Sequence, residues 1–203
     1  AIGLEYETSG ERQVVHANNE ILMSAGAIHS PQILQLSGVG NAAELQQLGI
    51  PIVADLPGVG QNLQDHVNAP LLYKSSLPLT ANSLYHNPIR KISEGLKYLF
   101  SRKGMLAMGA CYAGGYIKVQ PGVANPDIQA LLLLFSTEDL GGVPHKFDGV
   151  TVNVALMRPE SRGYVKAIDS HISTTPIIQP NYLDAKADRD TLVAGMREIR
   201  RII

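Results

Sequence analysis

The sequence predicts an α+β fold, in which a mainly antiparallel sheet has helices packed on one face. The first observation is a cluster of apolar runs with few helical segments between them, which favours an antiparallel sheet. These runs give the expected strands 67–73, 112–119, 128–135, 150–157 and 164–168. The second observation is the helical spacing of apolar residues within 88–102, which predicts an amphipathic helix packed on that sheet.

The composition is that of an ordinary globular protein. Hydrophobic residues make up 45% of the 203 residues and charged residues 17%, with a formal net charge of -1. No basic stripe stands out, which argues against a nucleic-acid partner. The longest apolar run, 128–135, is too short to span a bilayer. The single cysteine, Cys111, sits among small residues that predict a buried site, and it fits a reducing, cytoplasmic location.

The first 25 residues predict three strands. Residues 2–7 and 11–16 alternate around a short glycine-containing turn, which is the pattern of a hairpin. The compact apolar run 21–24 predicts the third strand, and small residues follow it. Ser30 and Pro31 are expected to cap and open the first helix.

Capping signals mark the later helices. Asn41, with Glu44 three residues further on, predicts a second helix that ends at Gly49, and a short strand is expected at 50–53. Pro88 opens the amphipathic helix. Its apolar face comprises Ile89, Ile92, Leu96 and Leu99. The last helical pattern has an apolar stripe of Leu192, Met196 and Ile199, which is expected to pack onto the sheet.

Two polar motifs admit both a functional and a structural interpretation. Gly38–Ala43 fits the dinucleotide fingerprint G-x-G-x-x-A, but a helical segment precedes it, so a helix-to-helix turn is favoured. Asp65 and His66 follow Asn62 after a glycine turn and form either an acid-base pair or a hydrogen-bonded loop. Adjacent residues seldom face each other, which favours the loop. The histidines lack metal-ligand spacing, so no metal site is predicted.

Both ends of the chain look cut. Residue 1 is not Met, and the final helical pattern stops without Gly, Asn or Pro, so we expect an internal piece of a longer chain. Such a piece is expected to expose apolar surface and to associate through it. On spacing alone, the residues do not identify a reaction.

Several motifs, which follow one another in the same order, resemble those of the glucose-methanol-choline (GMC) oxidoreductases. The run 24–40 is similar to the second signature of that family at every fixed position. The resemblance continues through 48–51 and 55–66, and 158–163 resembles the turn that opens the family's C-terminal region. Residues 180–183 are similar again. The match is weakest from 74 to 150 and lies nearest the choline-dehydrogenase-like branch.

The resemblance implies an FAD-dependent oxidation of a primary alcohol to an aldehyde by hydride transfer to the flavin. Residues 1–66 would be the C-terminal part of the first FAD-binding segment, and 67–203 an incomplete substrate-binding domain. The family's diphosphate-binding fingerprint would lie before residue 1 and its catalytic histidine beyond Ile203, so the chain holds no assigned catalytic residue. Alone, it is expected to bind no FAD and to be inactive. The implied cofactor-binding residues are Ala25, Gly26, Ser30, Asn62, Asp65 and His66.

Tyr112 is the implied substrate-binding residue. Choline-specific members of the family carry Glu just before Ala-Gly-Gly, where this chain has Tyr112. A tyrosine ring suits a quaternary cation by cation–π attraction and an uncharged alcohol equally well, so the departure speaks against choline itself. The alternative function is a non-catalytic binding or structural module with an oxidoreductase-like sheet. The residues do not distinguish oxygen from a quinone as electron acceptor, and they leave membrane association of the full-length protein open.

Overall fold

The chain folds into two compact units, and each is described by itself. The computed structural model describes residues 1–139 and 141–203. The first unit comprises Ala1–Leu63 and Gly163–Pro180, and the second comprises Gln64–Arg162 and Asn181–Ile203. The sequence prediction placed everything after residue 66 in one domain. Gly163–Pro180 instead joins the first unit because its strands pair there.

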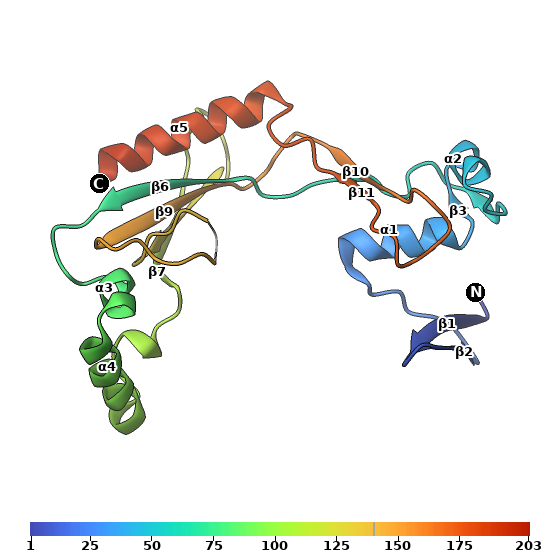
Figure 1. The fold of residues 1–203 in the computed structure, drawn as a ribbon. Coiled ribbons are helices and arrows are strands. Elements are labelled where there is room, and N and C mark those ends of the chain that lie inside the picture. The colour runs from blue at the N-terminus through green and yellow to red at the C-terminus, as the bar shows by residue number, and fades with distance from the viewer. Residues whose placement is uncertain (140) are drawn as a thin grey trace. The chain divides into compact units, whose positions relative to one another are not determined.

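The first unit combines short strands with two helices (Figure 1). Its elements are β1 (Gly3–Thr8), β2 (Glu11–His16), α1 (Gly26–Leu36), β3 (Val39–Gly40), α2 (Ala42–Gln47), β4 (Ala54–Asp55), β5 (Gln61–Leu63), β10 (Gly163–Lys166) and β11 (Ile177–Gln179). β1 and β2 form the predicted antiparallel hairpin, while β11, β10 and β5 form a three-stranded antiparallel sheet. β3 and β4 pair in parallel. β4 lies just beyond the strand predicted at 50–53, where Pro51 removes a ladder donor.

Two predictions for the segment around α1 are wrong. The apolar run 21–24 forms no strand, because no described residue pairs with it and a strand needs a partner for its backbone groups. α1 begins at Gly26, upstream of the predicted cap at Ser30, and Pro31 lies inside the helix. The residue four positions before the proline is the small, exposed Ala27, so the carbonyl that loses its helical partner can reach solvent.

α2 begins and ends as predicted. Asn41 Oδ1 accepts hydrogen bonds from the backbone N–H groups of Ala43 at 3.1 Å and Glu44 at 3.2 Å. Gly49 follows the last turn with a φ of 69°. The Glu44 carboxylate pairs with the Lys166 ammonium on β10 at 2.9 Å, so this side chain ties α2 to the three-stranded sheet.

The second unit is built on a four-stranded sheet. Its elements are β6 (Asn68–Lys74), α3 (Ala81–His86), α4 (Pro88–Ser101), η1 (Met105–Ala107, a 3₁₀ turn), β7 (Cys111–Ile117), β8 (Ile128–Leu133), β9 (Gly149–Leu156) and α5 (Lys186–Ile202). The strand order is β6-β9-β8-β7 and every neighbouring pair is antiparallel, which confirms the predicted sheet. The run 164–168 is the exception. Its strand is β10 of the first unit, so its predicted place in this sheet is wrong.

α5 covers one face of the four-stranded sheet, as its apolar stripe predicts (Figure 1). The buried core between them comprises Leu71, Ile128, Val152, Val154, Leu156, Leu192 and Ile199. Gly195 permits the close approach, because a Cβ there would lie 2.8 Å from Ile128 Cγ1 and 3.1 Å from Val154 Cγ1. A side chain at this position would force the helix away from the sheet.

α4 forms where predicted but does not bury its apolar face. The helix begins at Pro88, and the side chain of Asn87 accepts a hydrogen bond from the backbone N–H of Ile89 at 3.0 Å. α4 packs against α3 and η1. Its apolar side chains are exposed instead of lying on the sheet, because Arg90 and Glu94 on its polar side bond to the unit.

Candidate functional site

The start of α1 carries three of the predicted cofactor-binding residues. Ala25 is the N-cap, Gly26 is the first helical residue and Ser30 lies one turn further on. Among the described residues, no side chain caps this end and no acidic residue lies in the first turn, so its backbone N–H groups are available to an anion. A Cβ at Gly26 would meet no atom within 4 Å, so the approach is open. A helix start of this kind can accept an anion.

Two buried glutamines hold α1 in place, and sequence reasoning missed both. Gln32 Nε2 donates to the carbonyl of Thr174 at 2.9 Å. Gln35 Nε2 donates to the carbonyl of Val165 at 3.0 Å, and Gln35 Oε1 accepts from the backbone N–H of Ala167 at 2.7 Å. Their three-residue spacing places both amides on one face of the helix. The recurrence of glutamine three residues apart within this helix is the signal that could have found them.

Asn62 lies on β5, which pairs with β10, the strand that Gln35 contacts. Gly60, two residues before Asn62, has a φ of 81°, and a Cβ there would lie 2.1 Å from the carbonyl oxygen of Val165, so only glycine fits. Asn62 follows on β5, exposed and with a φ of 64°, a left-handed conformation that asparagine adopts more readily than most residues. The chain therefore presents Asn62 on a tightly constrained strand.

The G-x-G-x-x-A run at Gly38–Ala43 leads to a helix start that is already satisfied. α2 has only six residues. Its first backbone donors bind the side chain of Asn41 and that of Asp55, whose Oδ1 accepts from Ala42 N at 3.0 Å. These internal acceptors occupy the position that a phosphate would need. The run connects α1 to α2, as the sequence favoured, but it includes the short strand β3, which the sequence did not predict.

Asp65 and His66 lie together in the second unit. The Asp65 carboxylate accepts the Tyr182 hydroxyl through one oxygen and the backbone N–H of His66, at 2.8 Å, through the other. The hydrogen bond to Asp65, together with burial and the charge of the same carboxylate, raises the pKa of Tyr182 above its ordinary value of 10.0. Asp65 thus fixes the loop and not the His66 ring.

The Asp65–His66 loop lines a cavity of about 680 Å³. The other lining residues are Gln64, Met157, Arg158, Pro159, Glu160 and Arg162. The polar turn at 158–163, which the sequence analysis noted only as a motif, is therefore brought beside two predicted cofactor-binding residues. Tyr182 was missed as a site residue, although it lies in the motif at 180–183.

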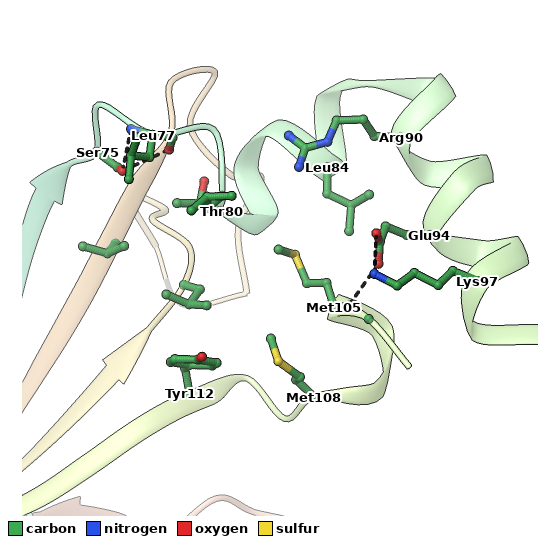
Figure 2. Close-up of a pocket in the computed structure, with 14 residues that line it drawn as sticks. Ser75, Leu77, Thr80, Leu84, Arg90, Glu94, Lys97, Met105, Met108 and Tyr112 are labelled. Carbon is green, nitrogen blue, oxygen red and sulfur yellow. Dashed lines mark hydrogen bonds and ion pairs between the residues drawn. The ribbon is translucent and has the colours of Figure 1, made fainter. Parts of the chain in front are cut away.

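Tyr112 lines a different cavity of the second unit, with a volume of about 560 Å³, in the range of small-molecule sites. Figure 2 shows the Tyr112 ring together with Met105 and Met108, which belong to η1 and the residue after it. The remaining lining residues are Ser75, Leu77, Leu79, Thr80, Leu84, Arg90, Glu94, Lys97, Gly104, Leu134 and Val150. The two methionines provide adaptable apolar surface and were not foreseen from the sequence.

The charged groups of this cavity come from α4 (Figure 2). Glu94 is the one carboxylate among its lining residues, and it is engaged twice. Its Oε2 accepts the backbone N–H of Met105 at 3.0 Å, and its Oε1 lies 3.6 Å from Lys97 Nζ. Arg90 donates to Ser83 Oγ at 2.6 Å. Two cations against one carboxylate leave the cavity wall with a formal charge of one positive unit.

The predicted site residues thus lie in separate places within the two units. Ala25, Gly26, Ser30 and Asn62 belong to the first unit, while Asp65, His66 and Tyr112 belong to the second. Asp65 and His66 share one cavity, and Tyr112 lines another. Cys111 beside Tyr112 is exposed, so the prediction of a buried cysteine is wrong. It begins β7, an edge strand, and its thiol donates to the carbonyl of Ala113 at 3.3 Å.

Neither a metal centre nor a membrane-spanning helix occurs in the described part of the chain. No group of three or more His, Cys, Asp or Glu side chains within 1–139 and 141–203 is placed to hold a metal ion. Among the same residues, no helix has both the length and the apolar character needed to cross a membrane.

Comparison with known proteins identifies relatives along the whole chain. A family model for GMC oxidoreductases matches residues 1–68. Mitochondrial choline dehydrogenase of Homo sapiens is 43% identical over 188 residues, which cover 93% of this chain and 32% of that protein. Alcohol dehydrogenase [acceptor] of Pseudomonas putida is 34% identical over 204 residues, which cover 100% of this chain and 37% of that protein. The chain therefore spans about a third of the length of these curated relatives.

Solved structures share the fold. A formate oxidase of Aspergillus oryzae RIB40 superposes with a TM-score of 0.86 at 23% identity, covering 98% of this chain and 39% of that one. Pyridoxine 4-oxidase of Mesorbium loti superposes with a TM-score of 0.76 at 23% identity, covering 98% of this chain and 35% of that one. These likenesses confirm the mixed fold class that the sequence predicted. The family-model match, the curated relatives and the ordered motifs show that the chain belongs to the GMC oxidoreductase family.

Proposed function

We propose that this chain is part of a flavin-dependent oxidoreductase that oxidises a primary alcohol to an aldehyde. Bound FAD would accept the hydride from the alcohol carbon. The observation that carries the proposal is the cavity lined by Tyr112 in a chain of this family. The first unit would contribute to FAD binding and the second would hold the alcohol.

On the cofactor side, the uncapped start of α1 supports a role in binding the FAD diphosphate. The backbone N–H groups beginning at Gly26 would donate to the anion, and the Ser30 hydroxyl lies one turn away. Asn62, Asp65 and His66 are proposed to border the cofactor. Because Asp65 already accepts the Tyr182 hydroxyl, its part would be to hold the loop in position.

On the substrate side, we expect a neutral alcohol. A buried ammonium group needs a carboxylate partner, since an unpaired buried charge is costly. Glu94 is already engaged by Lys97 and by the backbone N–H of Met105, and Arg90 adds a further positive charge. The cavity therefore offers no spare negative charge to a cation. The Tyr112 ring and the methionine side chains suit an aliphatic or aromatic chain.

Choline is the second candidate. The 43% identity to human choline dehydrogenase favours it, and the face of Tyr112 can hold a quaternary ammonium group by cation–π attraction. The 34% identity to alcohol dehydrogenase [acceptor] of Pseudomonas putida fits the neutral substrate. The two candidates differ in the charge that the cavity must stabilise.

The test compares two substrates in a protein that carries this chain at the full length of its relatives. We expect the wild type to have a higher kcat/KM for 1-butanol than for choline. The Tyr112→Glu substitution should move the ratio toward choline by about tenfold, corresponding to one added charge interaction of about 1.4 kcal/mol. Tyr116→Glu is the matched control, because Tyr116 lies on the same strand, is equally exposed and does not line the cavity.

A wild-type protein that clearly prefers choline would reject the neutral substrate. A Tyr112→Glu ratio that moves no more than that of Tyr116→Glu would remove Tyr112 from the substrate site. Turnover of no alcohol at all by the FAD-loaded protein would favour the non-catalytic module instead.

A further inference from the structure

α4 exposes an apolar stripe to solvent. Its apolar residues recur every three or four positions and so share one face of the helix. Ile89 is 77% exposed, Ile92 65% and Phe100 83%, and Leu96 and Leu99 lie between them on the same face and are at least half exposed. From Ile89 to Phe100 the stripe extends about 16 Å at 1.5 Å per residue. Ordinary amphipathic helices bury such a face against their own core.

The helix is oriented with its polar side toward its own unit. Arg90, Glu94 and Lys97 are spaced four and three residues apart and line the cavity beside Tyr112 (Figure 2). Arg90 donates to the Pro78 carbonyl at 3.0 Å and to Ser83 Oγ at 2.6 Å. Glu94 accepts the backbone N–H of Met105 at 3.0 Å. These bonds hold the polar face of α4 against the unit. The apolar stripe lies on the other face of the helix and therefore points to solvent.

The surroundings of the stripe are basic. Between Pro88 and Met108 the sequence has a single carboxylate, Glu94, and five cations, namely Arg90, Lys91, Lys97, Arg102 and Lys103. Lys91, Lys97, Arg102 and Lys103 are exposed. Lys91 Nζ lies 4.5 Å from the centre of the Tyr85 ring and Arg102 Cζ 5.1 Å from that of Tyr98, so these cations lie along aromatic side chains of the same helical region. An exposed apolar stripe with a basic surround is the pattern of a helix that lies in a membrane interface.

We propose that α4 docks this protein onto an anionic lipid surface, with the helix parallel to the membrane plane. The side chains of Ile89, Ile92, Leu96, Leu99 and Phe100 enter the boundary between headgroups and acyl chains, while the exposed cations outside the cavity, Lys91, Arg102 and Lys103, meet the lipid phosphates. The positive charge around the stripe favours an anionic membrane as the partner. A second copy of the same face would bring like charges together, whereas an anionic surface complements them. The proposal is independent of the alcohol that the protein oxidises.

The test uses a fluorescent reporter in the stripe. The chain contains no tryptophan, so the substitution Phe100→Trp introduces a single emitter at the proposed contact. We expect its emission to shift to shorter wavelength, and the protein to sediment, with vesicles of equal parts phosphatidylcholine and phosphatidylserine. Binding should fall by about tenfold or more with pure phosphatidylcholine or in high salt, because both weaken the attraction to lipid phosphates.

Two variants of the reporter protein locate the contact. Ile92→Glu with Leu96→Glu should abolish vesicle binding, and Lys91→Glu with Lys103→Glu should weaken it on anionic vesicles only. The matched control is Val14→Glu with Val15→Glu on β2, because these valines are 61% and 54% exposed but lie outside α4. Circular dichroism of each variant checks that the chain stays folded.

Several results would overturn the proposal. They are an absence of binding to either vesicle, or binding that the α4 variants leave unchanged. A concentration-dependent dimer that Ile92→Glu with Leu96→Glu disrupts, without vesicle binding, would assign the stripe to a second copy. If the Phe100→Trp reporter already emits at short wavelength without vesicles, in a protein of the full length of the relatives, another part of that protein covers α4.

Discussion

A single buried carboxylate organises the junction between the 158–163 turn and α5. Asp188 lies in the first turn of α5 and accepts hydrogen bonds from the backbone N–H of Glu160 at 2.7 Å, the backbone N–H of Ser161 at 2.8 Å and Ser161 Oγ at 2.5 Å. Burial opposes its ionisation, but these donors outweigh burial and hold the pKa of Asp188 below its ordinary value of 3.8. The folded state therefore favours the charged form.

Stability should consequently depend on pH through Asp188. Because the folded pKa is depressed, the stabilisation is complete above the ordinary pKa and is lost as the pH falls below 3.8 through the folded pKa. We expect Asp188→Asn to lower the free energy of unfolding by about 2–3 kcal/mol near neutral pH, as for hydrogen bonds to a charged group. The difference in the free energy of unfolding between the variant and the wild type should be smaller at about pH 3. Urea titrations of both proteins at the two pH values measure it.

Asp190→Asn serves as the control on the same helix. The Asp190 carboxylate pairs with Lys186 at the surface, where ion pairs contribute about 0–1 kcal/mol. Its effect should be small at both pH values. An Asp188→Asn difference that is as large in acid as at neutral pH would show that the destabilisation comes from packing and not from the charge.

At the scale of elements, α1 is attached to β10 by one amide. Gln35 satisfies the carbonyl of Val165 and the backbone N–H of Ala167, and the side chain is only 6% exposed. Gln35→Leu would keep the volume and leave both backbone groups without these partners, which costs about 1–3 kcal/mol for each unsatisfied buried group. We expect the amides of β10 and β11 to exchange with deuterium faster in Gln35→Leu than in wild type.

The matched substitution is Gln46→Leu on α2, where the glutamine is exposed. It removes the same side chain from a helix of the same unit and should leave exchange in β10 and β11 unchanged. Equal protection of β10 in wild type and Gln35→Leu would mean that strand pairing alone holds the segment.

The sequence predicted the elements well and their partners less well. Alternation and caps located β1, β2, β6 to β9, the start of α2 at Asn41 and the start of α4 at Pro88, because these signals act within a few residues. The pairing of β10 with β5 depends on residues about a hundred positions away, and no local signal encodes it. The outward stripe of α4 was unpredictable for the same reason. The helical spacing of apolar residues shows that α4 has an apolar face, but it does not show which partner that face contacts.

The candidate site was predictable only where a motif marked it. Tyr112 stood out because of the Ala-Gly-Gly that follows it, and Asp65 and His66 stood out within a polar run. Met105 and Met108 reach the Tyr112 cavity through the fold of the segment between α4 and β7, and Glu94 reaches it from α4. The sequence match was weakest in this segment, so its contribution to the cavity emerges only from the structure.

At the scale of the whole molecule, the chain passes between its two units three times, after Leu63, after Arg162 and after Pro180. Each unit is therefore assembled from segments that are distant in sequence. A boundary drawn at residue 66 follows composition, whereas the units follow strand pairing. The turn at 158–163 stands at one of these crossings, and Asp188 accepts hydrogen bonds from its backbone.

The last prediction concerns flavin binding by the chain of 203 residues. Dinucleotide cofactors are seated by a parallel sheet whose first crossover carries a glycine fingerprint. Among the described residues, the single parallel pairing is β3 with β4, of two residues each, and the helix start that follows β3 is filled by Asn41 and Asp55. The start of α1 can contribute donors to a diphosphate, but one helix end does not enclose a cofactor.

We therefore expect the purified chain to show no flavin absorbance, to leave the fluorescence of added FAD unchanged and to oxidise no alcohol. A protein at the full length of the curated relatives is the positive control for both measurements. A yellow preparation of the 203-residue chain whose flavin band survives dialysis would mean that this chain alone suffices for binding.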